Sequence, residues 1–375
     1  NNATRITKTK IGGVILQNPN FSGSAASLIL NEITGANRSS LTGVSEIAGQ
    51  KADYILANPN GITCNGCGFI NTSRSTLTTG SPRFDAAGAL EELSVTGGDV
   101  LIEGLGLDAT EADAFDIITR STGLLAQLNA NDLNMITGRN DVDYQSRSLT
   151  AKADDGSEKP VLAIDSSVLG GMYAGRITLI ATEAGVGVNT QGDMAVSTSD
   201  LSISADGRII VNKVQSSQNV SFTSANDAIE VNGNVSSGQN TTIKSKSTID
   251  AQNVSLTTGA DLSLTSQNVN VSNSQVVAGV DDQGELQAGQ GNLSIDVSDT
   301  LTYSGARLAA GKNLTVKANN IDSGDISHGL TSRGALSVEA QNMTKTSGGI
   351  SSDGDMTLNV ANLGLTSTGA MSKAQ

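Results

Sequence analysis

Short apolar pairs separated by polar corners run through the second half of the chain and restrict the folds that it can adopt. In the segment 260–276 the apolar pairs are Leu262 with Leu264 and Val269 with Val271. Each pair alternates with Ser, Thr or Asn, and a polar stretch separates one pair from the next. This spacing indicates short strands with one buried face, each followed by a turn. The pattern predicts a fold built from many short strands.

A second, longer period marks where each group of strands begins again. Glycine-led starts recur at nearly even spacing, at positions 291, 311, 334 and 354. Three strands of about seven residues each make a repeat of about 21 residues, which is the arithmetic of a parallel β-helix. We therefore expect an all-β chain that forms a parallel β-helix with three strands per coil of about 20–23 residues. An antiparallel sandwich is the rival fold, but it would not by itself enforce a fixed repeat.

The composition agrees with narrow coils. Hydrophobic residues make up 37% of the chain, but only 5 Phe, 4 Tyr and no Trp occur among 375 residues. A core must therefore be built from Val, Ile, Leu and Ala, which suit the narrow interior of a three-sided coil. The 42 glycines can occupy corners that require a positive φ.

One stretch, 81–145, shows no coil period. We expect its segments 93–95, 100–102 and 109–118 to form strands and a loop outside the β-helix. Two further polar breaks are predicted at the surface: a turn at 153–160 and the tip of an inserted hairpin at 279–284.

The charge of the chain excludes several partners. It carries 23 Lys and Arg against 37 Asp and Glu, a net charge of −14, and its basic residues are scattered. Nucleic acid and anionic membrane surfaces are therefore poor partners. No stretch approaches the roughly 20 apolar residues of a spanning helix, so stable membrane insertion is not expected.

The residues that could support catalysis are few. His328 is the only histidine, and it lies hundreds of residues from the two cysteines, so a zinc site with about four ligands is not expected. Acidic pairs such as Asp154 with Asp155 are adjacent, and within a strand their side chains would point to opposite faces. The sequence therefore predicts no enzyme, no cofactor and no metal.

Two turns in the early part of the chain have the same chemistry. Proline presets φ, the flanking asparagines can bond the adjacent backbone, and in the second turn a glycine allows a left-handed exit. On chemistry alone, both turns are interpreted as ordinary corners of a coil. Their residues are Asn18, Pro19, Asn20 and Phe21 in the first, and Asn58, Pro59, Asn60, Gly61 and Ile62 in the second.

The only two cysteines, Cys64 and Cys67, follow the second turn. A thioredoxin-type site would need a helix N-terminus after a strand, whereas these residues lie among Asn, Gly and Thr. A small disulfide that fixes the turn is the favoured interpretation and would imply an oxidising compartment. Two free thiols are the alternative.

Several motifs together resemble a known family. The run ILANPNGITCNGCGFINT at 55–72, followed by LTTG at 77–80, closely resembles the secretion (haemagglutination activity) domain of two-partner secretion exoproteins. That family includes filamentous haemagglutinins and CdiA-type contact-dependent growth inhibition effectors. Similar segments are LILNEIT at 28–34, DIITR at 116–120 with GRNDVDY at 138–144, and LGGMYAGRI at 169–177 with GVGV at 185–188. The resemblance covers residues 14 to about 190, and Phe21 stands where the family usually has leucine.

The resemblance implies a right-handed β-helix that leaves a Gram-negative cell through a cognate outer-membrane transporter of the TpsB (CdiB) type. The chain would cross the periplasm and then reach the cell surface. The residues of both Asn-Pro-Asn turns would then serve transporter recognition or folding nucleation. Residues 1–213 are expected to form the secretion domain, with its N-terminal cap missing, and residues 214–375 the start of a filamentous repeat.

The resemblance leaves the kind of exoprotein open. The favoured interpretation is a CdiA-type toxin that binds a receptor on a target cell through regions outside this chain. The alternative is a haemagglutinin-like adhesin that binds host or bacterial surfaces. A β-helix carbohydrate-active enzyme is a remote third interpretation.

Overall fold

The structure is a computed structural model that describes residues 1–375 except 22, 325–328, 346–348, 366–370 and 375. His328 lies outside the described residues. The described part of the chain consists of strands, turns and loops without a helix, and it therefore holds no helix that could cross a membrane. It divides into two compact units, Asn1–Met194 and Ala195–Gln375.

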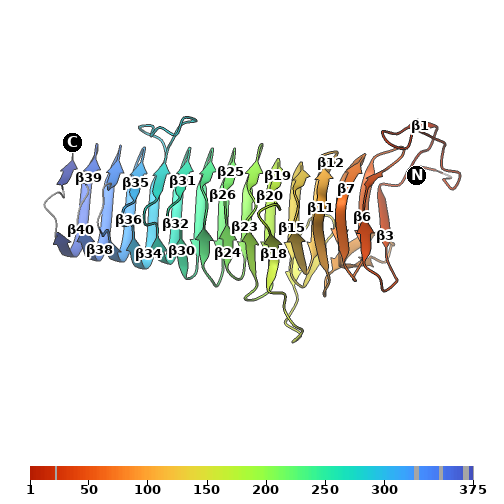
Figure 1. The fold of residues 1–375 in the computed structure, drawn as a ribbon, viewed down its shortest axis with the longest axis horizontal. Coiled ribbons are helices and arrows are strands. Elements are labelled where there is room, and N and C mark those ends of the chain that lie inside the picture. The colour runs from red at the N-terminus through yellow and green to blue at the C-terminus, as the bar shows by residue number, and fades with distance from the viewer. Residues whose placement is uncertain (22, 325–328, 346–348, 366–370, 375) are drawn as a thin grey trace. The chain divides into compact units, whose positions relative to one another are not determined.

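The first unit is built mainly from parallel strands (Figure 1, red to yellow-green). Its coil strands are β3 (Leu28–Glu32), β4 (Ser39–Leu41), β5 (Val44–Glu46), β6 (Ala52–Ala57), β7 (Ile62–Ile70), β8 (Thr72–Thr78), β11 (Asp99–Ala109), β12 (Ala112–Thr119), β13 (Ser121–Leu124), β14 (Leu128–Ala130), β15 (Asp132–Thr137), β18 (Leu162–Ser166), β19 (Met172–Ala174), β20 (Arg176–Ala181) and β21 (Gly187–Thr190). β22 (Met194–Val196) begins on the last residue of this unit.

The register of these strands stacks inward-facing side chains on one another. Ile62 of β7 pairs with Val100 of β11, which pairs with Thr122 of β13, and Thr122 pairs with Ile164 of β18. All four residues are at most 3% exposed. Each coil therefore buries its inward-facing residues against those of the coil before it, as expected for a β-helix.

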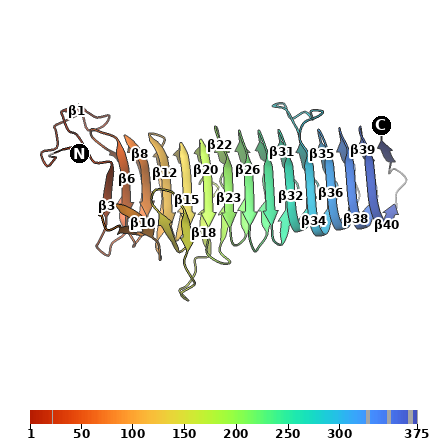
Figure 2. The same cartoon turned by 180° about the vertical axis from the view of Figure 1, so that it is seen from behind.

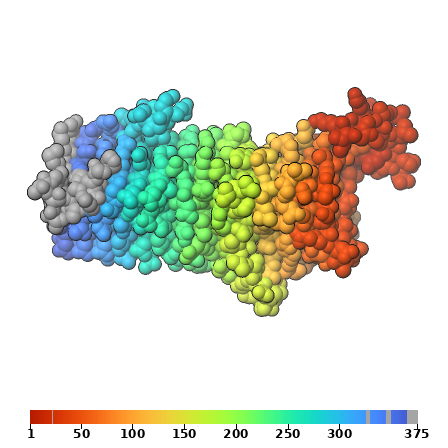
Figure 3. Space-filling model, viewed as in Figure 1, coloured from red at the N-terminus to blue at the C-terminus, as the bar shows by residue number. Residues whose placement is uncertain are grey.

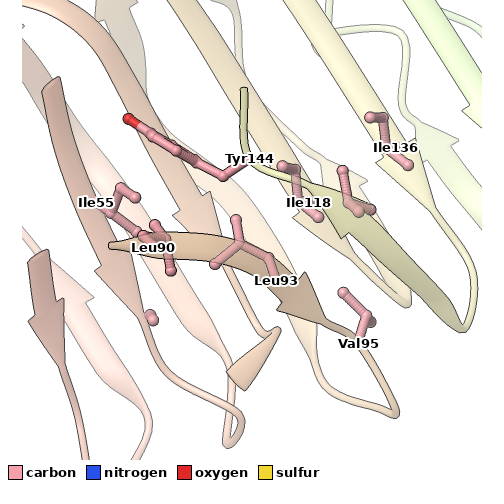
Figure 4. Close-up of a cluster of buried hydrophobic side chains, with 9 residues drawn as sticks. Ile55, Leu90, Leu93, Val95, Ile118, Ile136 and Tyr144 are labelled. Atoms are coloured by element: carbon pink, nitrogen blue, oxygen red, sulfur yellow. The ribbon is translucent and has the colours of Figure 1, made fainter. Parts of the chain in front are cut away.

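A four-stranded antiparallel sheet packs on the side of these coils. Its strands are β9 (Ser81–Phe84), β10 (Leu90–Ser94), β16 (Asn140–Asp143) and β17 (Leu149–Ala151), in the order β17-β16-β10-β9. In Figure 4, Leu90, Leu93 and Val95 lie near Ile55 and Ile118 of the coil strands, and Tyr144 is drawn beside them. The side sheet thus has its own small apolar core against the coils.

The side sheet corrects one prediction. Strands outside the β-helix are present at 81–94 and 140–151, but segments 100–102 and 109–118 belong to the coils. The segments that form the side sheet are inserted between coil strands, so paired coil strands lie further apart in the sequence. Ile62, for example, pairs with Val100, which lies well beyond the length of one ordinary repeat, and the period is therefore hidden there.

Two peripheral segments complete the first unit. A hairpin of β1 (Thr7–Lys8) and β2 (Val14–Ile15) is held by the Glu46 carboxylate, which accepts bonds from the backbone N–H groups of Lys10 and Ile11. The predicted surface turn at 153–160 is confirmed as a loop without strands. It projects from this unit in the space-filling view (Figure 3, yellow-green).

The second unit repeats the three-stranded coil (Figure 2, green to blue). Its strands are β23 (Leu201–Ala205), β24 (Ile209–Val211), β25 (Val214–Ser216), β26 (Val220–Ser224), β27 (Ile229–Val231), β28 (Val235–Ser237), β29 (Thr241–Ser245), β30 (Thr248–Asp250), β31 (Ser255–Thr258), β32 (Leu262–Asn270), β33 (Gln275–Ala278), β34 (Leu293–Thr302), β35 (Arg307–Ala310), β36 (Leu314–Asp322), β37 (Leu330–Ser332), β38 (Leu336–Lys345), β39 (Gly349–Ser352), β40 (Met356–Leu365) and β41 (Met371–Ala374).

The register of the second unit confirms the parallel β-helix and its repeat. Val220 pairs with Thr241, and Thr241 pairs with Leu262, so each partner lies one predicted repeat further along the chain. Leu262 pairs with Leu293, because the predicted hairpin is inserted after β33. That hairpin is closed by an antiparallel bridge between Val280 and Leu286.

Asparagine side chains join corners of successive coils in the second unit. The side-chain oxygen of Asn219 accepts bonds from the backbone N–H and the side-chain amide of Asn240, both at 3.1 Å. Asn240 in turn accepts a bond from the backbone N–H of Asp261. These polar residues therefore stabilise the corners, which explains their repetition in the sequence.

Candidate functional site

The first Asn-Pro-Asn turn lies at the surface close to the N-terminus. The Asn18 side-chain oxygen accepts a bond from the backbone N–H of Asn20 at 3.0 Å, and Phe21 donates its N–H to the Asn18 carbonyl at 3.2 Å. Asn18 also bonds the backbone of residues 1 and 3. Pro19 and Asn20 are exposed. The turn is therefore a preformed polar corner that a partner could reach.

The second turn has the same local geometry, but its first asparagine is buried. It joins β6 to β7, and its Asn58 is 0% exposed. The Asn58 side-chain oxygen accepts the Asn60 N–H at 2.9 Å, while its amide donates to the Asn37 carbonyl at 2.9 Å and to Ser39 Oγ at 2.8 Å. Because residues 37 and 39 belong to the preceding coil, Asn58 fastens one coil to the next.

Gly61 adds a second link at this corner. Its φ is +100°, and a Cβ at this position would collide with the guanidinium of Arg38. Arg38 crosses over the glycine and binds both carboxylate oxygens of Asp99 at 2.8 Å, and it also donates to the Ile62 carbonyl at 2.8 Å. The hydrogen bond from Arg38 to Asp99 raises the pKa of Arg38. Three successive coils are thereby joined at one corner.

A shallow pocket of about 370 Å³ lies beside the second turn. Pro59 and Asn60 line it together with segments 33–36 and 80–82, and its lining includes Glu32. The exposed half of the turn thus faces an open depression while Asn58 holds the buried half.

The two turns serve separate corners. The first is attached to residues 1–3, and Asn2 in turn bridges to Gly49, whereas the second is attached to residues 35–39. Within the described part of the chain no hydrogen bond joins one turn to the other. The structure therefore places all nine predicted turn residues in two independent corners.

Cys64 and Cys67 are bonded to each other in the structure. Both lie in β7, at 0% and 3% exposure, with Asn65 and Gly66 between them at the corner. Their oxidation state in the cell remains a prediction.

Sequence analysis did not identify a buried ionic contact that holds the side sheet. Asp116 of β12 is 0% exposed and accepts bonds from Arg74 at 3.0 Å and from Arg147 Nε at 2.7 Å. Tyr144 donates its hydroxyl to Asp53, and burial together with this carboxylate raises the pKa of Tyr144. The partners lie 31 to 91 residues apart, so no local pattern could reveal them.

The described residues contain no group of three or more His, Cys, Asp or Glu that could hold a metal ion. The polar groups singled out above bond the backbone or one another across coils. Their chemistry is that of a scaffold, in which side chains fix corners and join coils.

The first Asn-Pro-Asn turn precedes the first coil strand, so only the second is a corner of a coil as the sequence predicted. These features define a class of protein, a parallel β-helix with a side sheet and two Asn-Pro-Asn turns in its early part. Residues 8–211 match the model of the TPS secretion domain family. The chain therefore belongs to the two-partner secretion family, whose members are secreted exoproteins of Gram-negative bacteria. The matched family is a secretion module, which agrees with the scaffold chemistry of these residues.

Known proteins similar to the chain include large CdiA proteins. It is 36% identical to the 16S rRNA endonuclease CdiA of Enterobacter cloacae over 92% of this chain and 10% of that protein. It is 38% identical to the tRNA nuclease CdiA of Yersinia mollaretii over 86% of this chain and 11% of that protein. The chain thus spans about a tenth of the length of these relatives.

A solved structure is similar in fold. The crystal structure of a filamentous hemagglutinin secretion domain matches with a TM-score of 0.53 and 32% sequence identity. The match covers 65% of this chain and 81% of that chain. The family model and the solved structure agree that the chain contains a secretion domain.

Proposed function

We propose that residues 1–213 direct export across the periplasm and through a cognate outer-membrane transporter of the TpsB (CdiB) type. The same residues nucleate folding of the β-helix, and residues 214–375 are the first coils of a filament. The observation that carries the proposal is the repetition of one turn in two settings. Pro19 and Asn20 are exposed and Asn18 is only half-buried, which suits recognition by a partner, whereas Asn58 of the second turn is fully buried between coils, which suits nucleation.

Vectorial folding is the physical basis of this function. A coil that leaves a pore can bury its apolar residues only against a coil that has already formed. The first coils therefore need additional stabilisation, which the Asn58 bonds and the Arg38 contact with Asp99 supply. Export would then be driven by the folding of successive coils.

An export assay tests the proposal. The full-length exoprotein is expressed with and without its transporter, and folded protein is measured in the medium. We expect release only with the transporter, and strongly reduced release for the double substitution Asn58→Ala with Asn60→Ala. Asn129→Ala is a control for the loss of an asparagine side chain outside both turns, at a half-exposed position of β14. Normal export of the double variant would contradict the proposal.

We further infer that the exoprotein is a CdiA-type toxin that meets a receptor on a target cell through regions outside this chain. Relatives of 36% and 38% identity that are named CdiA nucleases support this inference. Co-culture with susceptible cells tests it. Loss of viable target cells is expected, whereas adhesion without growth inhibition would contradict it.

Adhesion is a second candidate function, and one surface of the second unit favours it. A groove of about 420 Å³ runs across β34, β36, β38 and β40. Asp296, Lys317, Glu339 and Asn359 line it and stand side by side in the register of these strands. Adhesion of cells that is lost on replacing Lys317 and Glu339 by Ala would support this alternative.

A further inference from the structure

The two cysteines occupy core positions rather than surface positions of the coil. Cys64 is aligned with Leu41 of the preceding coil and with Ile102 of the following coil. Cys67 is aligned with Leu107 of the following coil. Apolar side chains therefore occupy the aligned places on both sides of Cys64 and on the following side of Cys67, and the disulfide is part of the stacked interior.

The following coil seals this position. Cys64 Sγ lies 3.3 Å from the carbonyl oxygen of Gly106, and Leu105, although 89% exposed, comes within 3.1 Å of the place where Gly66 would carry a Cβ. Both cysteines are at most 3% exposed. Once the corner at 104–106 is in place, no second protein can reach either sulfur.

This burial limits when the bond can form. Thiol–disulfide exchange requires a thiolate to attack a sulfur directly, through a mixed disulfide, and its rate depends on access. An oxidising protein must therefore reach Cys64 and Cys67 before the coil of β11 covers them. In a chain that folds coil by coil, that moment precedes folding of the third coil.

We propose that Cys64 and Cys67 are the substrate of a periplasmic protein disulfide oxidant, which closes the ring while the chain is still unfolded and before it is exported. The inference rests on the proposed passage through the periplasm. One cysteine thiolate attacks the disulfide of the oxidant, forms a mixed disulfide and releases one thiolate of the oxidant. The second cysteine thiolate then attacks the sulfur of the first cysteine, and the other thiolate of the oxidant leaves. The two thiols of the chain lose two protons and two electrons, and the disulfide of the oxidant becomes a dithiol.

The disulfide closes a small ring of the chain between Cys64 and Cys67. Because this ring is small, its closure before export is compatible with passage through the transporter. Only Asn65 and Gly66 lie between the cysteines, so the bond joins residues that are already neighbours in the chain. A bond between distant coils would instead close a long loop and widen the chain in the pore. Closing the ring fixes the corner at Gly66, whose φ is +72°, before the coils assemble around it.

The test traps the oxidation state of the chain inside the cell. The full-length exoprotein is produced in cells that lack its transporter, and free thiols are blocked with one alkylating reagent at harvest. After reduction, newly released thiols are labelled with an isotopically heavy form of the reagent. Tryptic cleavage after Lys51 and Arg74 yields one peptide, 52–74, that contains both cysteines. Other cysteines of a longer exoprotein therefore do not interfere.

We expect peptide 52–74 from retained, protease-sensitive chain to carry at least a tenfold excess of heavy label at both cysteines. A peptide that carries the light label in retained chain and the heavy label only in exported protein would overturn the proposal, since the bond would then follow folding. Appearance of the exoprotein outside cells without the transporter would contradict the proposed function instead. The two failures are therefore distinguishable.

A second measurement checks the burial on which the inference depends. Exported native exoprotein is incubated with a thiol reductant, with and without denaturant, and the same peptide is analysed. We expect reduction at least tenfold faster in denaturant than in buffer. Equal rates would show that the sulfurs are accessible in the folded protein and would overturn the proposal. A Cys64→Val, Cys67→Val variant is the control for unspecific labelling.

Discussion

The two Asn-Pro-Asn turns allow a matched test of burial, because one local geometry occurs in two environments. Asn58→Ala removes two donated bonds to the preceding coil and two bonds accepted from Asn60. Asn18→Ala removes a bond to the Asn1 carbonyl and one from the Asn20 N–H, both of them exposed. Water can replace the partners of Asn18 but not those of the fully buried Asn58.

The expected magnitudes follow from these contacts. A net hydrogen bond contributes about 1 kcal/mol, and a buried group left without a partner costs about 1–3 kcal/mol. We expect Asn58→Ala to lower the local stability by about 3 kcal/mol, and Asn18→Ala by less than about 1 kcal/mol. A loss of about 3 kcal/mol corresponds to roughly 100-fold faster exchange of amide hydrogens that exchange through local opening.

Hydrogen exchange with mass spectrometry measures the effect of Asn58→Ala on peptides that contain the second turn and the coil at 35–41. The effect of Asn18→Ala is measured on peptides that contain the first turn and residues 1–3. Local exchange is preferable to a single unfolding midpoint, because coils of a β-helix can open separately. Equal loss of protection in the two variants would refute the argument from burial. If Asn18→Ala abolishes export without a loss of protection, the first turn acts in recognition rather than in folding.

Three further changes test other contacts. Gly61→Ala imposes a positive φ on alanine and displaces Arg38, so we expect a loss of about 2 kcal/mol in local stability; unchanged hydrogen exchange in peptides that contain the second turn would contradict this. Asp116→Asn deprives Arg147 of its carboxylate partner; we expect a loss of about 2 kcal/mol and faster proteolysis within the side sheet, while unaltered cleavage would argue against an anchoring role. Burial raises the pKa of Tyr303 to about 12 from 10.0, so stability is fully present below pH 10 and is lost as pH rises from 10 to 12. We expect the Tyr303→Phe variant to lack this loss of stability at alkaline pH. If the free energy of unfolding depends on pH identically in both proteins, the assignment to Tyr303 is disproved.

The strand pattern, and with it the coil, could be predicted from the sequence wherever one coil follows another directly. Pairs such as Leu262 with Leu264 indicate which face of a strand is buried. The even spacing of such pairs along the chain indicates the length of one coil. The prediction was wrong at 100–118, where these strands were placed outside the coils. Excursions into the side sheet interrupt the repeat there, so a pattern based on fixed spacing cannot find the partner strands.

For the candidate site, the sequence indicated which residues matter but not how they act. The two turns and the cysteine pair were identified from local chemistry and from their resemblance to a family. The difference in burial between the two turns could not be predicted, because Asn18 and Asn58 are followed by the same residues, Pro and Asn. Arg38 was not singled out at all, and Asp116 was noted only within the family-like segment 116–120, because each of them meets its ionic partner across coils.

The sequence by itself determined the repeating strand, the narrow aliphatic core, the corner chemistry and the family. These properties depend on residues within one or two coils of each other, where period and composition carry the information. Only the tertiary structure decided that the Asn58 side chain is buried between coils while the hydrogen bonds of Asn18 stay exposed, that Asp116 anchors a side sheet, and that both sulfurs lie in the core. Each of these features arises because residues from different coils pack on one another. Whether a side chain is buried there depends on the coils that surround it and not on its own neighbours in the sequence.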